Sequence, residues 1–344
     1  MERKRIIWLD ALRVFSIFCM IVLHAATSNY YKCPPHSYEW EVFSAYNGMV
    51  RFCVPAFVMI SGALFLNPSK EISLKSLFRK NILRIVCAFF FWSACYAIYS
   101  SEIYANITPE TIAQFIYELL IGHFHLWFLN MILGLYLIIP FMRKIAYEKR
   151  LMQYFLLLAS IFTIVLPSLM ALPLPGERTI TEIIRRVDIQ FVAGFPVYFL
   201  AGYYFYAYPI KRKAVQVTIY AMGILSAILA CIKHLYSYFM PSTAFITLAL
   251  FLFFQTALSE HPLPPGRIFP SKAVSRMIFL VSNCSFGIYL VHVFVIYLFS
   301  AVGFSTLSFN PVIAVPVIAI STFLCSFAIS YLISKIPVLG KYIV

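Results

Sequence analysis

The sequence predicts an all-α, polytopic integral membrane protein with about ten transmembrane helices. Of the 344 residues, 62% are hydrophobic and only 12% are charged, whereas about a quarter of the residues in a soluble domain are charged. The hydrophobic residues also occur in blocks of about twenty, which is long enough to cross about 30 Å of hydrocarbon. Basic residues gather between alternate blocks and predict that both termini face the cytoplasm.

Proline, glycine and charged residues bound the hydrophobic blocks and define the predicted helices. We expect these helices over residues 6–27, 44–66, 82–100, 124–141, 152–170, 188–207, 214–233, 241–258, 277–299 and 311–334. The loops are short, so we expect one membrane-embedded domain over 1–344 and no separate soluble domain. Thr108 before Pro109 predicts the start of an interfacial helix that continues to Ile121. A second interfacial helix is expected within 171–187.

The net charge of +14 also follows from membrane topology. Twenty of the 27 basic residues fall in segments that the alternating helices place on one side, and five fall on the other. This asymmetry obeys the positive-inside rule, so we expect membrane lipids and no nucleic acid as partners. The cysteines and histidines show none of the spacings typical of zinc ligands, and we expect no metal.

Two titratable side chains lie inside the first predicted helix. Arg13 and His24 are eleven residues apart, which on a helix corresponds to about 16 Å along the axis and about 20° around it. Charged groups inside a membrane are costly and indicate function. Asp10 lies three residues before Arg13, where it can orient the guanidinium. Mutual neutralisation of this pair, and a structural hydrogen bond from His24, are the open alternatives.

The predicted topology places further polar side chains in the outer half of the membrane. They are His24, Arg51, His125, Trp127, Tyr289 and His292. For each of them a structural role at the interface or against a backbone carbonyl stays open. The remaining histidines are expected to be solvated in loops, namely His36, His123, His234 and His261.

Four stretches resemble the acyltransferase family 3 of membrane proteins. The opening IIWLDALRVFSIFCMIVLH resembles the first helix of that family, in which an arginine and a histidine follow a Leu-Asp pair at similar spacing. The other stretches are RFCVPAFVMISGALFL at 51–66, HLWFLNMILGLYLIIPF at 125–141 and SFGIYLVHVFVIYL at 285–298. Their order and the ten-span length extend the resemblance over nearly the whole chain. The chain is most similar to the stand-alone members, which lack a fused hydrolase-like domain.

The resemblance implies transfer of an acyl group, often acetyl, from cytoplasmic acyl-CoA to a hydroxyl of an extracytoplasmic acceptor. We therefore expect acyl-CoA, in particular acetyl-CoA, as donor substrate and a surface or lipid-linked glycan as acceptor, in the cytoplasmic membrane of the cell. His24 is expected to act as general base and Arg13 to face the donor. A covalent acyl-histidine is the alternative. Arg51 or His125 is expected to stabilise the oxyanion or position the acceptor.

The donor nucleotide is a polyanion and is expected to stay at the basic cytoplasmic face. The strongest candidates for its phosphates are Lys75, Arg79, Lys80 and Arg84. Two other functions also fit ten spans with internal charges: a transporter or flippase that exports a glycan precursor, and a carrier that passes the acyl group to a separate enzyme.

Overall fold

The computed structural model describes residues 5–101, 103–170, 182, 186, 191–233, 237–258, 270–337 and 339–344. Every regular element in these ranges is a helix, and nine helical segments are long and apolar enough to cross a membrane. The predicted all-α polytopic membrane fold is therefore confirmed. The predicted span 188–207 corresponds to a shorter helix, α12 (Pro196–Ala207). The cytoplasmic location of the two termini stays a prediction.

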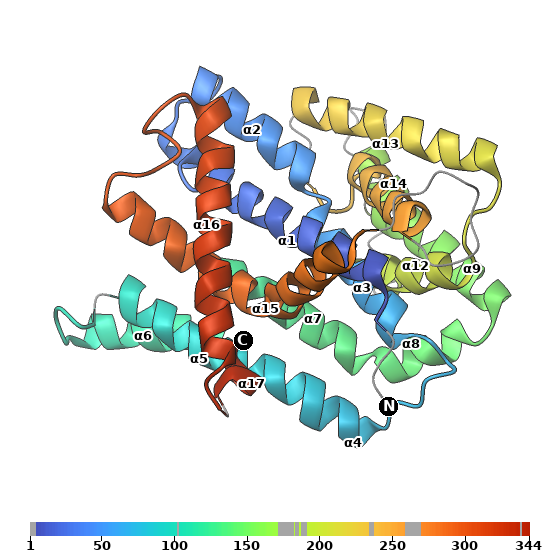
Figure 1. Ribbon diagram of the computed structural model, residues 1–344, viewed down its shortest axis with the longest axis horizontal. Coiled ribbons are helices and arrows are strands. Elements are labelled where there is room, and N and C mark those ends of the chain that lie inside the picture. Colours follow the sequence, from blue (N-terminus) through green and yellow to red (C-terminus); the bar gives the residue numbers. More distant parts are fainter. Residues whose placement is uncertain are drawn as a thin grey trace. The chain divides into compact units, whose positions relative to one another are not determined.

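The described chain divides into two units, and each is treated by itself. The first comprises Met1–Ser69 and Phe141–Ser282. It contains α1 (Ile7–Thr27), η1 (Tyr30–Lys32), α2 (Tyr38–Val50), α3 (Cys53–Phe65), α9 (Lys149–Ser160), η4 (Ile161–Val165), α10 (Leu166–Met170), α12, α13 (Lys213–Lys233) and α14 (Pro241–Leu258), labelled in Figure 1 where there is room.

The second unit comprises Lys70–Pro140 and Asn283–Val344. It contains α4 (Leu74–Ser76), η2 (Leu77–Ile82), α5 (Leu83–Ser100), α6 (Pro109–Ile121), η3 (Phe124–Leu126), α7 (Trp127–Leu137), α16 (Pro311–Ser334) and α17 (Leu339–Ile343). Two helices contribute residues to both units, α8 (Ile139–Ala146) and α15 (Lys272–Ala301). The expectation of a single membrane domain stays a prediction.

Helix α1 is uninterrupted, whereas the second predicted span differs from its expected bounds. That span begins earlier, at Tyr38, where the Ser37 hydroxyl accepts a hydrogen bond from the Trp40 amide at 3.3 Å. It is then broken at Arg51, and α3 begins at Cys53. Pro55 explains the break, because it has no N–H to donate to the carbonyl four residues earlier, which is that of Arg51.

Two glycines allow α3 and α12 to pack with their backbones in contact. A Cβ atom on Gly62 would collide with the carbonyl oxygen of Phe199, and one on Gly202 would collide with that of Met59. Small residues at such a crossing let membrane helices approach closely. The Ser-Gly of the 51–66 stretch therefore has a packing role, and α12 is held in the first unit.

In the second unit, the helix predicted from Pro109 to Ile121 is confirmed as α6, and its place at the membrane interface stays a prediction. The Thr108 side chain accepts from the amide of Thr111, and the Thr111 hydroxyl accepts from the amide of Thr108, at 3.3 and 2.9 Å. The helix ends at Gly122, whose φ of 84° turns the chain before α7. The second expected interfacial helix, within 171–187, lies almost wholly outside the described residues.

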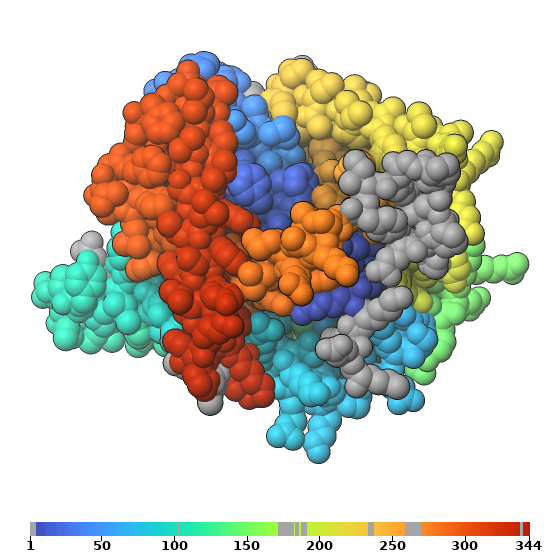
Figure 2. Space-filling view, viewed as in Figure 1, coloured from blue at the N-terminus to red at the C-terminus, as the bar shows by residue number. Residues whose placement is uncertain are grey.

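Large apolar side chains are exposed along α13 and α16. Figure 2 shows these helices at the surface in yellow and red. On α13 the exposed side chains include Ile224, Ile228 and Ile232, and on α16 they include Ile313 and Leu324. Apolar surface of this extent is unfavourable in water and is explained by contact with lipid.

Candidate active site

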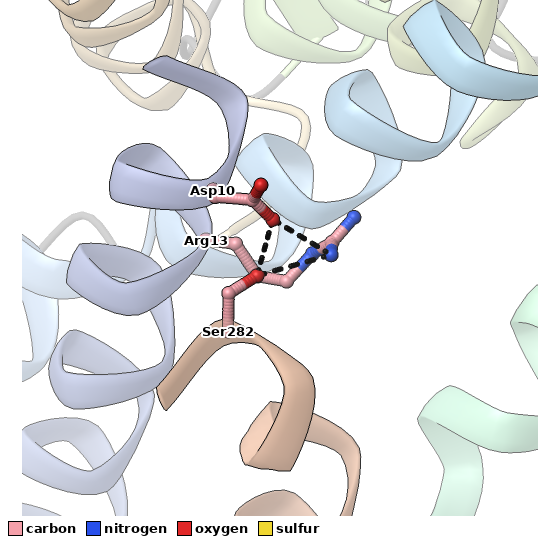
Figure 3. A network of polar contacts seen from close by, with 3 residues as sticks. All are labelled: Asp10, Arg13 and Ser282. Carbon is pink, nitrogen blue, oxygen red and sulfur yellow. Dashed lines mark hydrogen bonds and ion pairs between the residues drawn. The ribbon is translucent and has the colours of Figure 1, made fainter. Parts of the chain in front are cut away.

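Arg13 lies in the first half of α1, in a network of polar contacts with Asp10 and Ser282 (Figure 3). Its Nη1 atom donates to Asp10 Oδ1 at 3.5 Å and to Ser282 Oγ at 3.3 Å. Ser282 in turn donates to the same oxygen of Asp10 at 2.5 Å. The carboxylate and the hydroxyl therefore both contact the guanidinium, and the orienting role of Asp10 stays a prediction.

Ser282 is a member of this network that sequence reasoning missed. It is 3% exposed and lies on α15, 269 positions from Arg13. A lone serine just before a hydrophobic stretch carries no distinctive sequence signal. Only the packing of α15 against this end of α1 brings it to the arginine.

The continuity of α1 supports the predicted geometry of Arg13 and His24. Both residues lie on Ile7–Thr27, so about 16 Å of helix axis and about 20° of rotation separate them. Arg13 and His24 are half-buried. The Thr27 hydroxyl lies 3.4 Å from the His24 carbonyl, at the end of the helix.

Arg51 lies at the end of α2 and contacts a distant aromatic ring. Its Nη1 atom donates to the Tyr238 hydroxyl at 3.2 Å, and its guanidinium lies 5.0 Å from the centre of that ring. The Tyr198 hydroxyl donates to the Tyr238 backbone carbonyl at 2.6 Å and holds this segment in place. Tyr238 lies between α13 and α14, and its role was not predicted from the sequence.

The second unit brings together the other histidines predicted for the site. The rings of His125 and His292 are 5.4 Å apart and nearly perpendicular. The Tyr289 hydroxyl donates to the His125 backbone carbonyl at 2.6 Å, and His292 Nδ1 lies 2.6 Å from the Tyr289 carbonyl. His125 is 1% exposed and His292 is 0% exposed. Trp127 is half-buried at the start of α7, beside Phe128.

His123 belongs to this cluster, and the expectation that it is solvated is wrong. Its Nδ1 atom lies 2.9 Å from Nδ1 of His125, and its Nε2 atom lies 3.2 Å from the Tyr297 hydroxyl. The ring of Tyr96 stacks on it at 4.5 Å. The turn at Gly122 carries His123 inward, and loop position alone gave no sign of this. His36 is exposed as expected, and His234 and His261 lie outside the described residues.

The predicted phosphate-binding residues lie on a π-helical segment and its flanks. Lys75, Arg79 and Lys80 are exposed. Arg79 and Lys80 are adjacent on η2, and Lys75 lies on α4 immediately before it. Arg84 is different, because it donates to the Val344 carbonyl at 2.5 Å and lies 5.0 Å from the Phe286 ring. Its contacts within the protein make it the least available of the four.

In the part of the chain that the structure describes, no group of three or more histidine, cysteine, aspartate or glutamate residues is arranged to hold a metal ion. The groups that the site offers for chemistry are its arginines, histidines and hydroxyl groups. An arginine can bind a carbonyl or phosphate oxygen, and a histidine can accept and return a proton. A reaction that creates an oxyanion and moves a proton suits both.

The chain belongs to acyltransferase family 3. The model of that family, described as an acyltransferase domain, matches residues 6–331, which is nearly the whole chain. The protein is therefore a membrane-bound acyltransferase that acts on hydroxyl groups. No curated protein and no solved structure matches it.

Proposed function

We propose that this acyltransferase moves an acetyl group from cytoplasmic acetyl-CoA to a hydroxyl of an extracytoplasmic, surface or lipid-linked glycan, in the cytoplasmic membrane. The observation that carries the proposal is α1 itself. One continuous helix holds a fixed arginine in its first half and a histidine in its last turn. The donor cannot cross the membrane and the acceptor lies on its other side. The enzyme therefore needs one functional group near the donor and another near the acceptor.

The donor is assigned to the basic residues. Its phosphates are polyanionic and are costly to desolvate, so they remain at the membrane surface. The exposed cations Lys75, Arg79 and Lys80 suit them, and Arg84 supports the segment through its contact with Val344. Arg13, held by Asp10 and Ser282, is assigned to the carbonyl oxygens of the pantetheine arm or the thioester.

The transfer itself is assigned to His24. A neutral imidazole accepts the proton of the acceptor hydroxyl while its oxygen bonds to the thioester carbonyl carbon. The carbon–sulfur bond then breaks, CoA leaves as the thiolate, and the imidazolium releases its proton. In the covalent alternative the imidazole is acylated first, with the same overall products.

Arg51 and His125 are assigned to the oxyanion or to the acceptor. Tyr289 and His292 hold the His125 segment through the contacts described above, and Trp127 offers an aromatic face to a sugar ring. The family match disfavours the transporter alternative, because export of a glycan precursor requires no bond-forming chemistry. The carrier alternative differs from the proposal mainly in its final acceptor.

The proposal is tested with the purified full chain in lipid nanodiscs and acetyl-CoA labelled in its acetyl group. Cell-surface glycans isolated from cells lacking the protein serve as acceptor, and mass spectrometry detects the added acetyl. Wild-type protein is expected to add the group only when acetyl-CoA is present, and His24→Ala is expected to add none. Movement of a glycan precursor across vesicles without acetyl-CoA, with no transfer, would overturn the proposal.

A further inference from the structure

We propose that Ser44, Asn47 and Arg51 form a hydroxyl-binding row on α2 that recognises a polyhydroxylated acceptor. The inference rests on the proposed function and adds two residues, Ser44 and Asn47, that neither the family match nor the sequence motifs single out. It also assigns Arg51 to the acceptor in preference to the oxyanion.

The three side chains share one face of the helix. Residues 44, 47 and 51 are spaced i, i+3 and i+7, so their directions differ by at most about 60° around the axis of α2. Arg51 keeps helical backbone angles, with φ −59° and ψ −24°, and continues this face. The row runs about 10 Å along the axis.

The row is buried and its polar atoms have unused hydrogen-bonding capacity. Ser44 is 0% exposed and Asn47 is 5% exposed. Among the described residues, Ser44 Oγ, Asn47 Oδ1 and Arg51 Nε have no hydrogen-bond partner. A buried polar atom without a partner destabilises the protein, and three on consecutive turns indicate that a polar molecule faces them.

Contacts with α13 and with Tyr238 hold the orientation of the row. The neighbouring face of α2 packs against α13, where the Cys231 thiol lies 3.7 Å from the Ala45 carbonyl. A Cβ atom on Gly48 would collide with the Ala230 carbonyl, so the two backbones touch there. The far end is fixed by Tyr238, whose hydroxyl accepts from Nη1 of Arg51 at 3.2 Å, while Nε has no partner among the described residues.

The Ser44 end of the row lies at about the same depth as His24. Helices α1 and α2 are consecutive, pack together and are joined by a short connection, so they run antiparallel. The stacked rings of Phe15 and Phe52, 5.8 Å apart, set their register. His24 is nine residues after Phe15, which is about 14 Å along α1. Ser44 is eight residues before Phe52, which is about 12 Å in the same direction because the helices are antiparallel. An acceptor bound on the row therefore reaches the depth of the proposed base.

The chemistry of the row suits a molecule with several hydroxyls. Serine both donates and accepts, the asparagine amide does the same through two atoms, and arginine donates. One cation among neutral groups neither demands a charged ligand nor repels a neutral one. A sugar offers several hydroxyls at such spacing, whereas a simple alcohol offers one. The row thus selects a polyol and places one hydroxyl for acylation.

The test compares two acceptors of equal chain length, n-octyl β-glucoside and n-octanol, with acetyl-CoA and the full chain in nanodiscs. The wild type is expected to have the higher kcat/KM for the glucoside. Ser44→Ala and Asn47→Leu are each expected to raise KM for the glucoside about tenfold, the effect of one lost hydrogen bond. Neither should change KM for acetyl-CoA or transfer to octanol.

Ser93→Ala is the matched control. Ser93 lies on α5, is 0% exposed, and its Oγ is also without a partner among the described residues, but it is not on α2. It should leave both acceptors unaffected. Equal effects of Ser44→Ala and Ser93→Ala, or no glucoside preference in the wild type, would overturn the inference alone. Absence of transfer from acetyl-CoA to either alcohol would instead remove the proposed function. If Asn47→Leu does not fold, Ser44→Ala decides the result.

Discussion

The Nδ1 atoms of His123 and His125 lie 2.9 Å apart, so one imidazole donates a hydrogen bond to the other. The two rings cannot both carry a proton at these positions, and the pair therefore holds at most one positive charge in this geometry. The Tyr297 hydroxyl contacts Nε2 of His123 at 3.2 Å and links the pair to α15. The tautomers of His123 and His125 are therefore coupled through this hydrogen bond.

Substitutions that mimic one nitrogen at a time distinguish the two contacts of His123. An asparagine amide reaches the position of Nδ1, and a glutamine amide reaches that of Nε2. We expect His123→Asn to retain most acyl transfer and His123→Gln to lower kcat about tenfold, because only the first preserves the bond to His125. The pH profile of kcat should shift only in the glutamine variant. A glutamine variant as active as the asparagine variant would contradict this positioning role.

Replacing His24 is expected to abolish transfer without preventing membrane insertion. General base catalysis contributes about 10²–10⁴-fold to the rate. The kcat of His24→Ala should therefore be at least about a hundredfold lower than that of the wild type. Insertion and folding are checked by detergent-extracted yield and by size-exclusion chromatography. Full activity of this variant would remove the catalytic assignment.

The wild-type enzyme is expected to lose activity as the solution becomes more acidic. A base works in its neutral form, and protonation of the imidazole at low pH removes its acceptor nitrogen. The rate of acetyl transfer should therefore rise with pH and then level off. The measurement is kcat/KM from about pH 5 to about pH 9, and a rate that increases on acidification would argue against His24 as the base.

Features set by neighbouring residues were predictable from the sequence. The Thr108 cap and Pro109 define the start of α6, and the spacing of Arg13, Asp10 and His24 follows from a continuous helix. Pro55 carries a signal for the break at Arg51, although the predicted span 44–66 ignored it.

Contacts between distant parts of the chain were not predictable. Ser282 and Tyr238 lie 269 and 187 positions from their arginines, and their side chains are unremarkable in sequence. His123 sits in a loop, where the usual expectation is solvent, but stacking on Tyr96 draws it inward. The polar residues of the hydroxyl-binding row look like ordinary helix residues until their burial is known.

The Arg13 network is expected to govern donor affinity. Arg13→Ala removes the cation and should weaken binding of acetyl-CoA most, whereas Ser282→Ala leaves the cation but frees its position and should weaken binding about threefold to tenfold. Isothermal titration with acetyl-CoA measures both. Ser326→Ala on α16 is the control, because Ser326 is buried like Ser282, and this variant should bind normally. Unchanged affinity in Arg13→Ala would contradict the assignment.

The contact between α3 and α12 should make Gly62 intolerant of any side chain. A methyl group there meets the Phe199 carbonyl, and backbone cannot move aside as a flexible side chain can. Overpacking costs about 1–3 kcal/mol, and occasionally more, so Gly62→Ala should lower the thermal midpoint and the folded yield. On α7, a Cβ atom added to Gly134 would meet no atom of the described residues within 4 Å. Gly134→Ala should therefore be neutral or stabilising by about 0.5–1 kcal/mol, since alanine favours helix. Equal midpoints for the two variants, measured by thermal unfolding in the same detergent, would show that α12 does not press on α3 at Gly62.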